Sequence, residues 1–276
     1  MTRTTLEQFR EELLATGSYS TPPERLAPKV RKPSWWVTLQ FSWSVMSVFP
    51  RCGLAEMLGI LHPDKWAHFC FYPAWKAESF GTRLSAEGWN NRRDYSGPVV
   101  YLSNHMSATE TILLPFVLLT YGSFSTGVKA SLSHIPGVVK AAAHMGLVPI
   151  GRKNPREDLM TIFNVCGERI RQGQSVLIFA QGTRTPVFAR KGWSSIGAKL
   201  AEKAGVPVIP IAVKTDIQPT RLGAKGLAKD FGSVDPTKDI RLACGPVLRG
   251  TSREMNQAAY DWIADKLESW SMPTER

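Results

Sequence analysis

The sequence predicts an α/β protein in which a mostly parallel sheet is covered by helices, and two observations support this fold class. First, short apolar runs at 99–102, 176–179 and 206–213 have the length and composition of buried strands. Second, stretches with helical periodicity separate these runs, and strands that alternate with helices form parallel sheets. We therefore expect one sheet whose strands run mostly in one direction, with helices packed on it.

Local signals mark the beginnings and ends of the expected helices. Asn154, followed by Pro155, is typical of a helix start, and Gly173 and Gly205 are typical helix stops. Thr251 has the spacing of a capping box with a glutamate three residues later. From these signals and the apolar periodicity, helices are expected at 107–119, 154–172, 194–204 and from 251 onward.

A polar segment at 87–94 divides the chain, and we expect an N-terminal helical, interfacial region at 1–92 and a catalytic domain at 93–276. With 276 residues the chain can bury a sizeable core. Residues 1–17 read as a polar amphipathic helix rather than as a secretory signal. The four cysteines are far apart in the sequence and have no paired spacing, which fits a reducing cytosolic environment.

The segment 33–50 has no charged residue and is rich in aromatic side chains. As a helix its eighteen residues would reach about 27 Å, somewhat less than the roughly 30 Å core of a bilayer. Its many hydroxyl and amide side chains also argue against a membrane span. One face of this helix would carry Trp35, Trp36, Leu39, Trp43 and Met46. We expect the helix to lie at a lipid interface, and the alternative is an amphipathic helix packed on the domain.

The net charge of the chain is +11, and part of it is concentrated between residues 183 and 229. There, nine basic residues (Arg184, Arg190, Lys191, Lys199, Lys203, Lys214, Arg221, Lys225, Lys229) face two acidic ones (Glu202, Asp216). Such a basic surface could bind an anionic lipid surface, an acidic acyl carrier protein or a nucleic acid. A basic surface that is simply solvated is the alternative.

A histidine and a carboxylate lie five residues apart in the segment 104–110, Asn-His-Met-Ser-Ala-Thr-Glu. His105 can take a proton from a hydroxyl near neutral pH, and Glu110 can hold the other ring nitrogen and stabilise the imidazolium. This is the chemistry of moving an acyl group onto an alcohol. Glu110 could instead cap the helix that follows, and His105 could be an ordinary loop residue. A position at the carboxyl end of a strand favours the catalytic interpretation.

A second candidate site is the loop after the strand at 176–179. Gly182 and Thr183 let backbone amides approach an anion, and the guanidinium of Arg184 can bind a phosphate through two hydrogen bonds. Arg152 has a similar setting, and Lys129 could add charge. The alternative for each arginine is a surface ion pair. The remaining histidines have no ligand spacing, and no metal site is expected (His62, His68, His134, His144).

Four blocks of the sequence together resemble the PlsC-type glycerolipid acyltransferases. Residues 104–110 are similar to the family's Asn-His-x-Ser-x-x-Asp, and 146–152 are similar to Gly-x-x-Phe-Ile-x-Arg. Residues 179–185 resemble Phe-Pro-Glu-Gly-Thr-Arg-Ser, and 205–211 resemble the strand with Val-Pro-x-x-Pro. One block alone occurs by chance in many chains, whereas four in order are specific. The resemblance covers roughly residues 98–215.

Three positions depart from the family's pattern. Glu110 stands where the family usually has Asp, and the glutamate keeps the charge and adds one methylene. Pro149 stands where the family usually has Phe. Gln181 replaces a glutamate beside the expected acceptor site and offers an amide instead of a charge. The identity of the acceptor therefore depends most on Gln181.

The resemblance implies a glycerol-3-phosphate-acyltransferase-like fold and an enzyme of phospholipid biosynthesis. It would move a fatty acyl chain from a thioester, on coenzyme A or an acyl carrier protein, to a hydroxyl of a lysophospholipid such as 1-acylglycerol 3-phosphate. His105 would be the general base and Glu110 its orienting partner. By the same resemblance, the acceptor's phosphate would be held by a set of residues that Gln181 helps to shape: Arg152, Gly182, Thr183 and Arg184.

The resemblance also implies the partners and the location of the protein. No cofactor is expected besides the acyl donor, and no nucleic acid is expected as a partner. The protein would associate with an anionic membrane surface, on the cytoplasmic face of the cell membrane. Two alternatives remain at this point: an acyl thioesterase that uses the same dyad with water, and a non-catalytic basic protein that binds membrane or nucleic acid.

Overall fold

The computed structural model describes residues 4–30, 32–129, 146–150, 159–221 and 231–275. Its central feature is an eight-stranded sheet with the strand order β1-β2-β9-β8-β3-β6-β4-β5. The pairs β1–β2 and β8–β9 are antiparallel, and the other neighbouring pairs are parallel. This confirms the predicted mostly parallel sheet. The strands are β1 (Tyr19–Ser20), β2 (Leu84–Glu87), β3 (Val100–Ser103), β4 (Phe124–Lys129), β5 (Leu147–Ile150), β6 (Ser175–Phe179), β8 (Val208–Lys214) and β9 (Ile240–Cys244).

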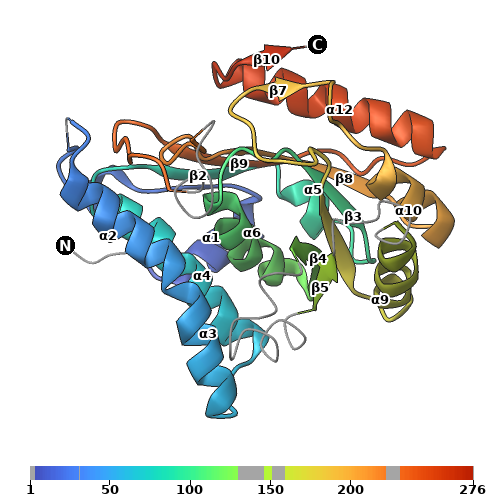
Figure 1. The fold of residues 1–276 in the computed structure, drawn as a ribbon, viewed down its shortest axis with the longest axis horizontal. Helices are drawn as coiled ribbons and strands as arrows, with labels where there is room; N and C mark the ends of the chain where they lie inside the picture. The colour runs from blue at the N-terminus through green and yellow to red at the C-terminus, as the bar shows by residue number, and fades with distance from the viewer. Residues whose placement is uncertain (1–3, 31, 130–145, 151–158, 222–230, 276) are drawn as a thin grey trace.

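Helices cover both faces of this sheet, as Figure 1 shows. Tyr101 of β3 packs into a core with α1 (Leu6–Thr16), α4 (Pro63–Glu78) and α6 (Thr109–Leu118). Val100 and Leu102 point to the opposite face and pack with α10 (Ile196–Ala204) and α12 (Ser252–Ser269). Successive side chains of a strand alternate between faces, so a strand buried on both faces reads as a continuous apolar run. The central strands were predictable for that reason.

The predicted helix signals hold where the structure describes them. The helix expected at 107–119 is α6 followed by the 3-10 turn η2 (Leu119–Tyr121), and α6 begins at Thr109. Gly205 ends α10 with φ 69°, and the capping box of Thr251 is formed at the start of α12. Residues 151–158, where Asn154 and Pro155 were expected to start a helix, lie outside the described residues. Beyond them a π-helical stretch, η4 (Ile162–Cys166), leads into α9 (Gly167–Arg171), and Gly173 follows with φ 81°.

The N-terminal segment contributes to the same sheet and the same core. β1 and β2 extend the sheet beyond β9, and α1 and α4 pack on it together with α6. Its other elements are η1 (Pro23–Arg25), α2 (Trp35–Met46), α3 (Val48–Met57) and α5 (Asn90–Arg93). Residue 92 lies between β2 and β3, two strands of one sheet. The predicted division at residue 92 therefore stays a proposal that the two parts of the chain have different functions, one at a lipid interface and one in catalysis.

The aromatic segment at 33–50 forms two helices, α2 and α3, which meet at Ser47. The inner side of α2 packs into the core through Val37, Phe41 and Val45. Its outer side is exposed and consists of the five residues expected from the sequence, here called the tryptophan face: Trp35, Trp36, Leu39, Trp43 and Met46, with exposed fractions from 75% at Trp35 to 38% at Met46. Exposed apolar residues continue along α3 and just beyond it at Leu54, Met57, Leu58 and Ile60. In the described part of the chain, every helix is too short or too polar to cross a membrane.

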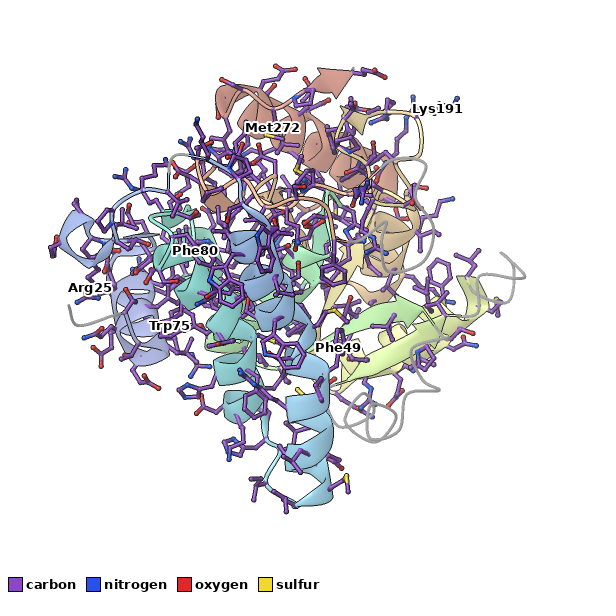
Figure 2. All side chains as sticks on the ribbon, turned by 60° about the vertical axis from the view of Figure 1, so that its left-hand side comes forward. Arg25, Phe49, Trp75, Phe80, Lys191 and Met272 are labelled. Atoms are coloured by element: carbon purple, nitrogen blue, oxygen red, sulfur yellow. The ribbon has the colours of Figure 1, made fainter. Side chains whose placement is uncertain are left out.

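A second, two-stranded sheet, formed by β7 (Phe188–Ala189) and β10 (Thr274–Glu275), was not predicted. β7 belongs to the loop that follows β6, and β10 follows α12; the two strands pair parallel. Figure 2 shows Lys191 and Met272 at the same end of the molecule, away from the tip of α3. Phe188 is buried against Tyr260 of α12, with 4.9 Å between the ring centroids. The loop after β6 is therefore fastened to the C-terminal helix.

Candidate active site

The candidate residues lie at the carboxyl ends of three adjacent strands. His105 follows the end of β3 by two residues, and Gln181 follows the end of β6 by two. Thr215 comes directly after β8. β3 lies between β8 and β6, and all three run parallel. Open parallel sheets bind ligands at this edge, and the order of the strands brings together segments that are far apart in the sequence.

The loop that carries the histidine is hydrogen-bonded to both neighbouring strands. The side chain of Asn104 donates to the carbonyl of Val213 and accepts from its N–H, both at 2.8 Å. On the other side, the backbone N–H of His105 donates to Oε1 of Gln181 at 2.8 Å, and the N–H of Thr185 donates to the carbonyl of His105 at 3.1 Å. The first and third sequence blocks are thus joined through the backbone of His105.

His105 and Glu110 form the predicted pair. Nδ1 of His105 lies 2.8 Å from Oε1 of Glu110, and the imidazole ring stacks on Phe179 with 4.3 Å between centroids. The carboxylate is fully buried, whereas 11% of the histidine side chain is exposed. Because Glu110 binds Nδ1, Nε2 is the ring nitrogen that can accept a proton from a hydroxyl.

Glu110 also folds back on the residues before α6, although the N-cap of that helix is Ala108 and makes no side-chain capping hydrogen bond. The Glu110 carboxylate accepts from the N–H groups of Met106 and Ser107 at 2.5 and 2.8 Å and from the hydroxyl of Ser107 at 2.8 Å. The hydroxyl of Thr215 donates to Oε2 at 2.6 Å. The carboxylate of Glu110 thus binds His105 and the backbone before the helix at once, without forming the capping box that the sequence suggested.

The environment of Glu110 favours its ionised form. Burial by itself would raise the pKa, but the hydrogen bond and charge of His105, with hydrogen bonds from Thr215 and Ser107, outweigh burial and hold the pKa of Glu110 below its ordinary value of 4.5. A carboxylate that is ionised at neutral pH keeps Nδ1 as the protonated nitrogen of the ring. It also stabilises an imidazolium when Nε2 takes up a proton.

Gln181 is hydrogen-bonded to the loop that carries His105. Its side chain is buried; Oε1 accepts from His105, and Nε2 lies 3.5 Å from the carbonyl of Val187. An amide can serve both contacts, whereas a carboxylate would face the Val187 carbonyl with no proton to donate. The amide that departs from the family pattern thus fits the neighbouring backbone groups of this chain.

The other predicted anion-binding residues differ in how far the structure describes them. Gly182 and Thr183 are exposed in the loop after Gln181, and Arg184 is half-buried next to them. Arg152 lies outside the described residues, so the expected pair of arginines has one described member. Lys129 is the last residue of β4, at the same carboxyl edge as His105.

The described residues hold no cluster of histidine, cysteine and carboxylate side chains suited to a metal ion. The four cysteines are buried thiols. Burial raises the pKa of Cys52 and of Cys244 to about 12 each, so neither is a thiolate nucleophile at neutral pH.

Two contributors to the site were not predicted as such. Phe179 belongs to the third block, but its stacking on His105 depends on the spacing of β3 and β6. Thr215 follows the strand of the fourth block, and the one available signal was a polar residue placed directly after a buried run. Its role requires knowing that β8 lies beside β3.

A histidine–carboxylate pair at the carboxyl edge of a parallel sheet, bound to the loop of the third block, is the arrangement that the sequence predicted for an acyltransferase, and comparisons with known proteins point to the same class. Residues 83–214 match the family model described as Acyltransferase. A 1-acyl-sn-glycerol-3-phosphate acyltransferase of Pseudomonas aeruginosa is 28% identical over 245 residues, which cover 86% of this chain and 88% of that protein. The chain is thus similar to acyltransferases over its central residues, and over most of its length to one 1-acyl-sn-glycerol-3-phosphate acyltransferase.

Two partial matches and one solved structure add to these comparisons. Two chloroplastic 1-acyl-sn-glycerol-3-phosphate acyltransferases, from Brassica napus and Arabidopsis thaliana, are 33% and 34% identical over 166 residues, or 59% of this chain. The chain spans 44% and 42% of their lengths. The crystal structure of the 1-acyl-sn-glycerophosphate acyltransferase PlsC from Thermotoga maritima covers 86% of this chain and 95% of its own, with a TM-score of 0.61 and 18% identity. At that identity the likeness shows the fold.

Proposed function

We propose that the protein acylates a lysophospholipid, 1-acylglycerol 3-phosphate, with a fatty acyl chain from a thioester. The observation that carries this proposal is the 2.8 Å contact between Nδ1 of His105 and the buried carboxylate of Glu110 at the carboxyl edge of the sheet. The names of the relatives from Pseudomonas aeruginosa and from the two plants agree with this acceptor. The donor would be acyl-coenzyme A or an acylated carrier protein.

The reaction would proceed in two bond changes. Nε2 of His105 takes the proton of the acceptor hydroxyl as its oxygen bonds to the thioester carbonyl carbon, and Glu110 stabilises the imidazolium. The carbon–sulfur bond then breaks, and the leaving thiolate takes the proton from the imidazolium. Atoms and charges balance without a cofactor. The phosphate of the acceptor would lie at the exposed loop of Gly182, Thr183 and Arg184, with Arg152 as a further cation.

Association with an anionic membrane is part of the same proposal, since a lysophospholipid reaches the enzyme from a bilayer. Trp35, Trp36 and Trp43 are 75%, 54% and 64% exposed, which is unusual for side chains of this size on one helix. Tryptophan is favoured at the headgroup level of a bilayer, and the nearby Lys32 and Arg51 would attract anionic headgroups. We place the protein at the cytoplasmic face of the cell membrane, bound through this surface.

The decisive experiment is product analysis by mass spectrometry with purified protein. Acyl-coenzyme A and acylated carrier protein are each offered with a panel of lysolipids, and His105→Ala is assayed beside the parent. We expect a diacylated product that depends on acceptor and a loss of about 10²- to 10⁴-fold in rate in His105→Ala. Free fatty acid released at the same rate with and without acceptor would instead establish a thioesterase. Full activity in a folded His105→Ala variant would refute the histidine mechanism.

A further inference from the structure

Thr215 is a buried residue that directly contacts the catalytic pair. It follows β8 and is fully buried, and its Oγ1 lies 2.6 Å from Oε2 of Glu110 and 3.0 Å from Oγ of Ser107. It stands one residue beyond the segment that matches the acyltransferase family model, which ends at residue 214. The four sequence blocks do not include it either.

The other described partners of Glu110, which is the second residue of α6, come from the loop just before that helix. Within the described residues, the carboxylate accepts from His105, Met106 and Ser107, and Thr215 is the one partner from elsewhere in the chain. Contacts to this loop alone would let the carboxylate follow any movement of the loop. Thr215, directly after β8, instead ties the carboxylate to the sheet, whose neighbouring strand β3 leads into the loop.

The length of the glutamate makes such an anchor necessary. Glutamate has one more rotatable bond than the aspartate usual in the family, and each torsion that is not fixed multiplies the orientations available to the carboxylate. Only orientations that direct Oε1 at Nδ1 of His105 support catalysis. A hydroxyl 2.6 Å from Oε2 removes the others, because a charge-assisted hydrogen bond is short and directional.

We propose that Thr215 is a positioning residue of the proposed acyltransferase reaction, which fixes the carboxylate of Glu110 so that it orients His105. The proposal rests on the function proposed above. Thr215 itself touches neither substrate nor the reacting atoms. Its hydroxyl also favours the ionised form of the carboxylate, since a donor to a carboxylate lowers the pKa.

The test compares three variants by steady-state kinetics over a range of pH. Thr215→Val keeps the shape of the side chain and removes the hydroxyl, and Thr215→Ser keeps the hydroxyl. Thr82→Val is the matched control, because Thr82 is also fully buried and its hydroxyl donates to a carbonyl, that of Pro236, at 3.1 Å. Melting temperatures are measured for all three variants.

We expect Thr215→Val to lower kcat by about 10- to 100-fold with little change in the KM of either substrate, since a hydrogen bond to a charged group is lost from the transition state. The acid limb of its kcat profile should move to higher pH, because Glu110 is protonated more readily without this donor. Thr215→Ser should recover most of kcat and the original acid limb. Thr82→Val should lower the melting temperature and leave kcat and the acid limb as in the parent.

Two results would overturn the proposal. One is a Thr215→Val variant whose kcat, and the acid limb of whose kcat–pH profile, are the same as in the parent. The other is a lower kcat in Thr215→Val with an unchanged acid limb of the pH profile, together with an equally low kcat in Thr215→Ser. That result would indicate a packing role for Thr215. His105→Ala separates this failure from failure of the proposed function: an inactive His105→Ala beside a fully active Thr215→Val removes only the role of Thr215.

Discussion

Replacing Glu110 by glutamine is the sharpest perturbation of the site, because it keeps the shape of the side chain and removes its charge. Five donor groups point at the carboxylate: the Nδ1–H of His105, the N–H of Met106, the N–H and O–H of Ser107, and the O–H of Thr215. An amide has one oxygen to accept and an NH₂ group that must itself donate. Only the two hydroxyls can turn to accept, so the NH₂ group must take the place of Oε2.

The effect on catalysis and the effect on stability have different sizes. His105 would then face a neutral amide oxygen, and the imidazolium would lose its counter-charge, so we expect kcat to fall by about 10²- to 10⁴-fold. Rearranged buried donors should cost about 1–3 kcal/mol of the free energy of unfolding. At about 2–4 °C per kcal/mol for a domain approaching this size, the melting temperature falls by several degrees while the protein stays folded.

The assay is acyl transfer under saturating substrates, with circular dichroism and thermal melting on the same samples. Glu110→Asp keeps the charge and restores the family's usual residue, and it should keep appreciable activity. Glu78→Gln is the control for a buried carboxylate outside the site, since Glu78 is 3% exposed and accepts from Thr21 at 2.9 Å. Parental kcat in a folded Glu110→Gln variant would refute the orienting role of the charge and leave the hydrogen bonds to Met106 and Ser107 as the function of this glutamate.

Three further predictions follow from the surface, the loop and the buried carboxylate. Changing the three tryptophans of the tryptophan face to serine should weaken binding to anionic liposomes by about 100-fold in a sedimentation assay, because each tryptophan contributes about 1 kcal/mol of binding free energy. Met160→Ser, which removes an exposed apolar side chain elsewhere, should leave binding unchanged. Equal binding by all proteins would make the face a packing surface. Arg184→Lys should raise the KM of a phosphate-bearing acceptor by about tenfold and leave the KM of the donor unchanged, because an ammonium cannot make the two parallel hydrogen bonds of a planar guanidinium. Equal KM values for phosphate-bearing and phosphate-free acceptors, in the parent and in the variant, would contradict a phosphate site. Burial, opposed by weaker hydrogen bonds, raises the pKa of Glu78 above 4.5, so the parent loses stability as pH rises from about 4.5 through the folded pKa. Glu78→Gln lacks this loss, and its melting temperature relative to the parent should increase with pH; a difference independent of pH would argue against the shift.

The sequence predicted the centre of the sheet better than its edges. The runs at 99–102, 176–179 and 206–213 are buried on both faces and therefore continuously apolar, and they became β3, β6 and β8. β4, with the sequence Phe-Ser-Thr-Gly-Val-Lys, has too many polar and small residues to read as a buried strand. β5 contains Pro149, which is tolerated there because β5 is an edge strand.

The candidate site was predictable where neighbours in the sequence are also neighbours in space. His105 and Glu110 are five residues apart, so a local pattern could suggest their pairing, and the structure brings them to 2.8 Å. The hydrogen bond between Gln181 and His105 could not be predicted in this way, because the two residues follow different strands, β6 and β3. Thr215 likewise depends on the order of strands in the sheet, a property that no short segment encodes.

The inner side of α2 is joined to the rest of the protein by hydrogen bonds as well as by apolar packing. Thr38 accepts from the N–H of Val234 at 3.0 Å, and Ser42 accepts from the side chain of Gln218 at 2.7 Å. The N–H of Gln218 in turn donates to the carbonyl of Thr215 at 3.3 Å. Hydrogen bonds are directional, so α2 cannot roll about its axis or slide along it without breaking them. If the tryptophan face binds a surface, the fold therefore sets the height of His105 above that surface and the tilt of the site relative to it.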